Sequence, residues 1–143
     1  MRVAADACGM DVTAIDHVNL TLPADRVDEA VAFYEGTLGF PAETLEAYRA
    51  GETSLLTFRL ADDAVIHTRP SESFTPPAEA DADRFGHTCL RVPREPDDLQ
   101  RELEAADVAV DAVGERRGAT GVATSVYVVD PFGYRWELKA VGD

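Results

Sequence analysis

Residues 16–23 read "DHVNLTLP" and residues 86–93 read "GHTCLRVP". A shift of 70 positions superposes three pairs of residues: His17 on His87, Leu20 on Leu90 and Pro23 on Pro93. Side chains of a strand alternate between its two faces. In the first stretch this alternation separates the apolar Val18, Leu20 and Leu22 from polar side chains. We predict a strand whose polar face begins with His17, and the same strand again in the second half.

The rest of each half repeats the same order of elements. Apolar residues at helical spacing predict a helix over 25–38, ending at Gly39, and a second helix over 96–106 that starts at Pro96. Turn residues at 61–63 and 130–133 separate runs that are typical of strands. The strands expected after the helices are 42–48, 53–60 and 64–69 in the first half, and 110–116, 124–129 and 134–140 in the second. Each half therefore has the order β-α-β-β-β.

This repeat sets the expected domain organisation. We predict an N-terminal arm over 1–13 and one α+β domain over 14–141. The domain divides into a first module at 14–70, a polar, proline-containing linker at 71–84 and a second module at 85–141. A chain of 143 residues is long enough for one domain with a real core.

Charge and composition exclude several classes of partner. The formal net charge is −14, from 27 acidic residues against 13 basic ones, of which Lys139 is the only lysine. This balance argues against nucleic acids and anionic membranes as partners, and it resembles proteins from a high-salt cytoplasm. The chain has no apolar run of about 18 residues that could span a membrane, and no apolar stretch typical of a signal peptide. We expect a cytoplasmic protein.

The two cysteines do not predict a disulfide framework. Cys8 lies in the expected N-terminal arm. Cys89 lies in an expected strand, where we predict a small buried side chain rather than a ligand. Trp136 shares a face with Leu138, opposite Glu137, so we expect it in the core.

The repeat also superposes the histidines. The same shift places His67 on Glu137, both in the fourth strand of their half, so every histidine and one carboxylate occupy equivalent positions. A single strand histidine is usually just a polar surface residue, but this superposition favours a metal site. Imidazole and carboxylate suit Fe(II), Mn(II), Ni(II), Co(II) or Zn(II). The ligands would be His17, His67, His87 and Glu137. The alternative is a two-histidine, one-carboxylate set of His17, His87 and Glu137.

These residues lie in motifs that resemble one known superfamily. The stretches "IDHVNLTLP", "AVAFYEGTLGF", "AVIH", "FGHTCLRVP" and "VYVVDPFGYRWEL" are similar to those of the vicinal oxygen chelate superfamily, which includes glyoxalase I, bleomycin resistance proteins and extradiol dioxygenases. The resemblance covers residues 14–141. It implies that two βαβββ modules form an open, U-shaped mixed sheet around a metal cleft. It also implies that one divalent metal ion is held at the four positions named above, and that the protein is a homodimer.

The resemblance to bacterial glyoxalase I implies a lyase or isomerase. Such an enzyme binds a small substrate through two neighbouring oxygens, and a carboxylate moves a proton between adjacent carbons. Glu137 is the candidate base. This chain has His67 where that family usually has Glu, and Thr21 where glutathione-using members tend to carry Arg. A thiol adduct other than that of glutathione is therefore an alternative substrate.

Three alternatives remain within the superfamily. Tyr127, ten residues before Glu137, resembles the catalytic tyrosine of extradiol dioxygenases, which use Fe(II) to cleave catechol rings. The histidine expected shortly before that tyrosine is absent, because residues 118–120 read Gly-Ala-Thr. A metal-free small-molecule binder is the second alternative, although such proteins generally lack the metal residues. A metal-dependent epimerase, which needs similar chemistry, is the third.

Overall fold

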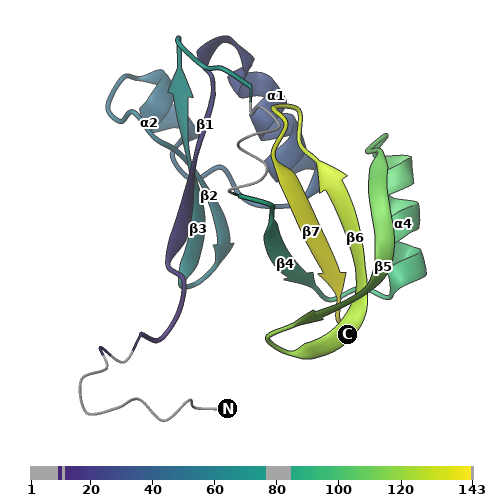
Figure 1. Cartoon of the computed structure of the whole chain (residues 1–143). Helices are drawn as coiled ribbons and strands as arrows, with labels where there is room; N and C mark the ends of the chain where they lie inside the picture. Colours follow the sequence, from purple (N-terminus) through teal and green to yellow (C-terminus); the bar gives the residue numbers. More distant parts are fainter. Residues whose placement is uncertain (1–9, 11, 77–84, 143) are drawn as a thin grey trace.

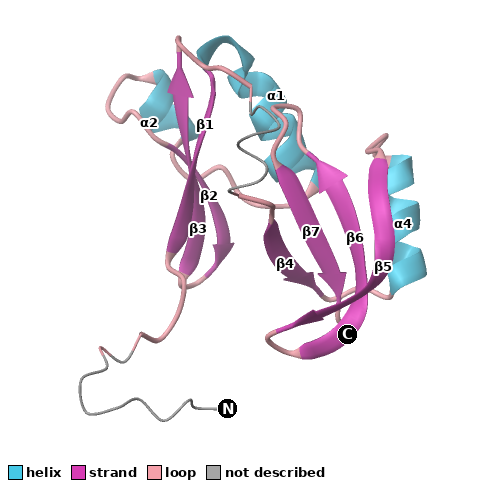
Figure 2. Ribbon diagram, viewed as in Figure 1, coloured by secondary structure: helices cyan, strands magenta, loops and turns pink. Residues whose placement is uncertain are grey.

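A computed structural model describes residues 10, 12–76 and 85–142 as two β-sheets standing side by side, with helices behind and beside them (Figures 1 and 2). Three parts of the sequence prediction lie outside the described residues: Cys8, most of the expected N-terminal arm, and residues 77–84 of the expected linker. The α+β fold class is confirmed. The first half contributes one sheet and the second half contributes the other.

The first sheet has the strand order β1-β3-β2. Strand β1 (His17–Pro23) pairs in parallel with β3 (Ala64–Ser71), and β2 (Leu56–Ala61) pairs with β3 in antiparallel fashion. The predicted alternation of β1 is confirmed, since Leu20 and Leu22 are buried while His17 is exposed. Residue 19 lies beside His67 in the parallel register, which brings the start of β1 next to the middle of β3.

The second sheet has the order β4-β7-β6-β5. Strand β4 (Thr88–Val92) pairs in parallel with β7 (Arg135–Ala140), while β6 (Gly121–Val129) is antiparallel to both β7 and β5 (Val110–Gly118). His87 immediately precedes β4. The long β5–β6 hairpin bends across the front of β7, and α4 (Pro96–Ala105) covers the opposite face (Figure 1).

One hydrophobic core joins the two halves. The first helical segment runs through a 3₁₀ turn at Ala24–Arg26, α1 (Val27–Val31) and wider π-type turns at Ala32–Thr37, so the predicted helix over 25–38 is confirmed. The core contains Phe33 and Tyr34 from these turns, Phe58 from the first sheet, and Trp136 from the second sheet. Trp136 is 1% exposed, as its place opposite Glu137 predicts.

A buried hydrogen-bond network reinforces this junction. The Tyr34 hydroxyl donates to Asp130 Oδ2 over 2.5 Å and accepts a hydrogen bond from Trp136 Nε1 over 3.2 Å. Asp130 Oδ1 also accepts from the backbone N–H groups of Phe132 and Tyr134, which fixes the turn between β6 and β7. The first-half helix is therefore fixed to a turn of the second half by polar as well as apolar contacts.

One predicted strand is wrong. The sequence predicts a strand over 42–48, but the structure has α2 (Leu45–Arg49) there. Only Ala42 makes an isolated bridge, to Phe58. The sequence "LEAYR" contains good helix formers, and local preference here departs from the repeat.

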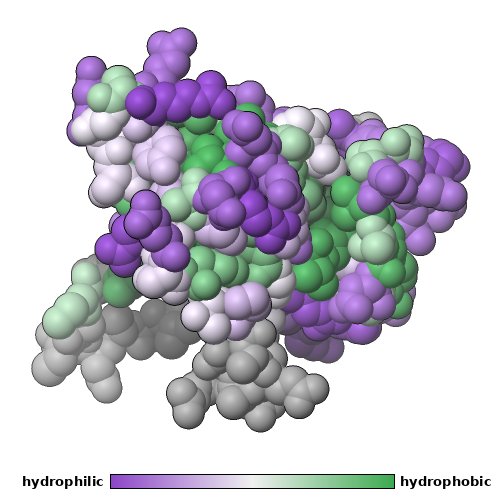
Figure 3. All heavy atoms as spheres, turned by 90° about the horizontal axis from the view of Figure 1, so that it is seen from above, coloured by the Kyte–Doolittle hydropathy of each residue, from purple (hydrophilic) through white to green (hydrophobic). Residues whose placement is uncertain are grey.

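The face of the molecule seen in Figure 3 carries both hydrophilic and hydrophobic areas. On the face shown in Figure 3, hydrophilic side chains surround smaller apolar areas. Among the described residues, no helix is long and apolar enough to cross a membrane.

Candidate metal and substrate site

Two of the predicted ligands form a pair on the first sheet. The rings of His17 and His67 lie edge to face, with their centroids 4.7 Å apart. His17 Nδ1 is 2.7 Å from Asp16 Oδ2, and His67 Nδ1 is 2.8 Å from the hydroxyl of Thr57 on β2. A hydrogen bond on one ring nitrogen fixes the orientation of an imidazole and directs a metal to the other nitrogen. Both rings therefore have the supporting contact at Nδ1 that is typical of metal-binding histidines. Nε2 is the nitrogen that would bind a metal.

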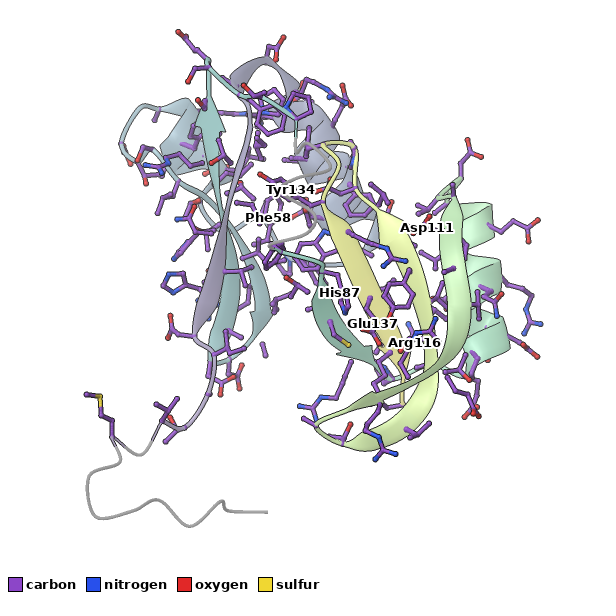
Figure 4. The ribbon with its side chains drawn as sticks, in the orientation of Figure 1. Phe58, His87, Asp111, Arg116, Tyr134 and Glu137 are labelled. Atoms are coloured by element: carbon purple, nitrogen blue, oxygen red, sulfur yellow. The ribbon has the colours of Figure 1, made fainter. Side chains whose placement is uncertain are left out.

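The other two predicted ligands form a pair on the second sheet. His87 Nε2 lies 2.7 Å from Glu137 Oε2, and the hydroxyl of Ser125 donates to Glu137 Oε1 over 2.6 Å. Ser125 is fully buried and Glu137 is 6% exposed, so the carboxylate is fixed at a defined position. The Tyr127 ring lies edge to face with His87 at 5.3 Å. Figure 4 shows His87 and Glu137 together on the face of this sheet.

The surroundings of Glu137 keep it ionised. Burial acts to raise the pKa of Glu137, but hydrogen bonds from Ser125 and Tyr127, together with the nearby His87, outweigh burial and lower that pKa below its ordinary value. Burial raises the pKa of the Tyr127 hydroxyl, against the lowering effect of Arg116. At neutral pH, Glu137 is thus a carboxylate that lies next to the protonated phenol of Tyr127.

The structure places the four predicted ligands in two pairs rather than in one cluster. In the described part of a single chain, no group of three or more His, Cys, Asp or Glu side chains could hold a metal ion. The chemistry of the donors nevertheless fits a divalent transition metal, because each pair supplies two side chains of a suitable type. His17 and His67 lie on neighbouring strands, and His87 immediately precedes the strand that pairs with that of Glu137. His17 and His87 keep 45% and 34% of their side-chain surface exposed, so neither pair is sealed off.

One prediction near the site is wrong. Cys89 is exposed rather than buried, because it lies on β4, an edge strand of the second sheet. It lies opposite Glu137 in the β4–β7 register. Its pKa is raised, by partial burial first and by the negative charge of Glu137 second.

The residues that hold the ligands in place were not predicted. Thr57 lies on β2, next to the strand of His67, and Ser125 lies on β6, next to the strand of Glu137. Asp16 directly precedes His17. The register of the two hairpins, counted from the turns at 61–63 and 130–133, indicates which residues lie opposite the ligands. Thr57 pairs with His67 across the first hairpin, and the second hairpin places Tyr127 opposite Glu137.

Comparison with known proteins identifies the family. A family model described as Glyoxalase/Bleomycin resistance protein/Dioxygenase superfamily matches residues 14–138. The chain belongs to this superfamily. The curated protein "Virulence protein STM3117" of Salmonella typhimurium is 31% identical over 131 residues, which cover 91% of this chain and 85% of that protein.

Solved structures of the superfamily share the fold. The crystal structure of the same Salmonella protein aligns with a TM-score of 0.69 at 27% identity, covering 92% of this chain and 98% of that one. A glyoxalase/dioxygenase from Nostoc punctiforme aligns with a TM-score of 0.72 at 18% identity, covering 99% and 100% of the two chains. The fosfomycin resistance protein FosX of Listeria monocytogenes aligns with a TM-score of 0.60 at 16% identity, covering 90% and 93%. The superfamily includes enzymes with several activities, so the choice among them depends on the site.

Proposed function

We propose that this protein is a divalent-metal-dependent enzyme that acts on a small substrate bound through two neighbouring oxygens, in the manner of a glyoxalase-I-type lyase or isomerase. The observation that carries the proposal is the hydrogen bonding and the relative position of the His17 and His67 rings. Both rings have Nδ1 engaged by a protein oxygen and lie side by side, which is how proteins prepare imidazoles for a metal. A polar surface face would not require either feature.

The two pairs support a site shared between two copies of the chain. Each pair supplies only two ligands, and one described chain does not unite them. A two-fold axis that brings the His17–His67 pair of one copy opposite the His87–Glu137 pair of another makes two equal sites at once, because two-fold interfaces are self-complementary. We therefore propose a homodimer in which each site has ligands from both chains.

Proton transfer is the chemistry that the second pair supports. The metal would act as a Lewis acid that polarises the substrate oxygens. Glu137 is held as a carboxylate by Ser125 and Tyr127, and it is the group able to accept a proton from one carbon and return it to the next. Its second oxygen, which contacts His87, is the one available for a ligand role.

Complementation between two variants tests the shared site. His17→Ala and His87→Ala each break one pair, so each homodimer should retain no metal. When the two variants are co-expressed, a mixed dimer contains one site with both pairs intact and one with both broken. Random pairing should then restore about a quarter of an equivalent of metal per chain. Asn19→Ala, an exposed neighbour on the same strand face, is the control that should keep metal fully.

The possible results separate the hypotheses. Restored metal in the mixture supports the shared site. Full metal in either single variant contradicts the ligand assignment, and a mixture that binds none contradicts sharing between chains. Elemental analysis of untagged protein purified without oxygen then identifies the chemistry. About one equivalent of air-stable Ni, Co, Zn or Mn per chain supports proton transfer, and the next assay is isomerisation of hemithioacetals of glutathione and of other small thiols.

A second candidate function is an extradiol dioxygenase. Tyr127 favours it, because its ring touches His87 and its hydroxyl interacts with Glu137, next to the place where a substrate oxygen would bind. Iron(II) that is lost on exposure to air, together with oxygen uptake on addition of a catechol, would support this alternative and contradict the lyase.

A further inference from the structure

The face of the second sheet that carries Glu137 also carries an unusual group of cations. Residues opposite one another in neighbouring strands share a face. In the β6–β7 register Tyr127 lies opposite Glu137, and Ser125 lies opposite Lys139. Lys139, the only lysine of the chain, is therefore on the same face as Glu137, two residues further along β7. It is 3% exposed, although lysine is rarely buried without a carboxylate partner.

The β5–β6 hairpin leaves room for these cations. A Cβ atom at Gly118 would lie 2.9 Å from Lys139 Nζ, and one at Gly114 would lie 2.5 Å from Arg116 Nη1. Side chains at these two positions would therefore displace the ammonium and the guanidinium. Figure 4 shows Arg116 on the same side of the sheet as Glu137 and His87.

Arg116 lies close to the proposed metal ligand. Its guanidinium is 5.5 Å from the centre of the Tyr127 ring, and Tyr127 lies opposite Glu137 in the β6–β7 register. Arg116 and Glu137 therefore share Tyr127 as a neighbour. A substrate group that reached Arg116 would lie on the face that carries Glu137.

In the part of the chain that the structure describes, neither Arg116 nor Lys139 is balanced by a carboxylate. Arg135, on the same face, is paired with Asp111 over 2.9 Å. Across the described ranges, neither Arg116 nor Lys139 forms an ion pair. Lys139 Nζ donates to the Gly121 carbonyl, and Arg116 donates to the carbonyl of Glu115. Among the described arginines, Arg69, Arg91 and Arg117 also form no ion pair. What sets this face apart is a lysine that is 3% exposed and has no carboxylate partner among the described residues, in a chain with a net charge of −14.

We propose that Arg116, supported by Lys139, binds an oxyanion group of the substrate, either a carboxylate or a phosphoryl group, while the rest of the substrate reaches the site at Glu137. A guanidinium presents its N–H groups as a planar fork that matches both kinds of oxyanion. The inference rests on the proposed function for the position of the substrate. The binding of the oxyanion by itself does not need the metal.

The test measures anion binding to the intact, chelator-treated protein. Isothermal titration calorimetry with inorganic phosphate, and separately with acetate, is carried out at constant ionic strength. Binding of one and not the other identifies the class of oxyanion. Arg116→Gln should weaken the binding by about ten-fold or more, the size expected for a lost charge-assisted hydrogen bond. Arg117→Gln makes the same charge change on the other face of β5 and should change the affinity by less than about two-fold.

A second variant guards against a folding artefact. Lys139→Met keeps the length of the side chain and removes its charge, so it should also weaken binding while circular dichroism confirms the fold. The proposal is overturned if neither anion binds the wild-type chain, or if Arg116→Gln and Arg117→Gln weaken binding equally. It is also overturned if anions bind only to metal-loaded protein and do so without Arg116. A protein that retains no metal but binds an oxyanion through Arg116 would contradict the proposed function and leave this inference standing.

Discussion

The strongest test of the fold is the removal of one hydroxyl group at the junction of the two halves. Tyr34→Phe deletes the group that donates to Asp130 Oδ2 and accepts from Trp136 Nε1. Tyr34 and Trp136 are each 1% exposed and Asp130 is 5% exposed, so water cannot replace the lost partner. A hydrogen bond to a charged group contributes about 1.5–3 kcal/mol and a neutral one about 1 kcal/mol. We expect the free energy of unfolding to fall by about 3 kcal/mol.

The assay is thermal and urea unfolding followed by circular dichroism at a fixed protein concentration. For a chain of this length, the expected loss lowers the melting temperature by about 10 °C. Tyr134→Phe is the matched control. Its hydroxyl donates to the Thr21 carbonyl over 2.6 Å from a partly buried position, so its loss should cost only about 1 kcal/mol.

The pH dependence of this deficit provides a second check. Burial raises the pKa of Asp130, while the hydrogen bond from Tyr34 partly lowers it. The variant loses that lowering effect, so its folded state has a still higher Asp130 pKa and binds a proton more readily. A raised folded pKa contributes stability at low pH that is lost as the pH rises through it. The deficit of Tyr34→Phe should therefore shrink as the pH falls from neutral through the folded pKa of Asp130.

Either of two results would refute this reasoning. One is a loss no larger than that of Tyr134→Phe, and the other is a deficit that grows in acid. A double-mutant cycle with Asp130→Asn isolates the pair, and a coupling energy near zero would also count against it.

Three further predictions concern the site and the surface. Tyr127→Phe should reduce turnover only a few-fold for proton transfer, whereas a large loss with metal retained, measured by steady-state kinetics and elemental analysis, would favour the dioxygenase. Gly36→Ala should raise the free energy of unfolding by about 0.5–1 kcal/mol, because nothing lies within 4 Å of the added Cβ. Gly118→Ala should lower it by about 1 kcal/mol, because the added Cβ moves Lys139 away from the Gly121 carbonyl. Urea unfolding measures both changes. Raising the salt concentration should raise the melting temperature by screening the charge of −14, and a melting temperature independent of salt would contradict the expectation of a high-salt protein.

The sequence was a good guide wherever apolar periodicity and turn residues agreed. The alternation at 16–23, the glycine ending the first helix at Gly39 and the turn at 130–133 all lie where they were expected. The strand predicted over 42–48 is wrong because the local helix preference of this segment outweighs its position in the repeat. The prediction that Cys89 is buried is wrong. Cysteines in strands are often buried, but Cys89 is two residues from His87 and therefore shares the polar face of the strand.

The position of the two halves relative to each other could not be read from the repeat. A repeat shows that His17 is equivalent to His87, and His67 to Glu137, but this equivalence holds whether the two faces meet within one chain or across two. The arrangement is decided instead by residues that have no counterpart in the repeat. Tyr34 reaches Asp130 and Trp136, which fixes the helix of the first half against the second sheet and leaves each ligand pair on its own sheet. If that network fixes the two modules in this arrangement in solution, a complete four-ligand site needs a second copy, and a variant that weakens the junction should lower metal affinity without touching any ligand.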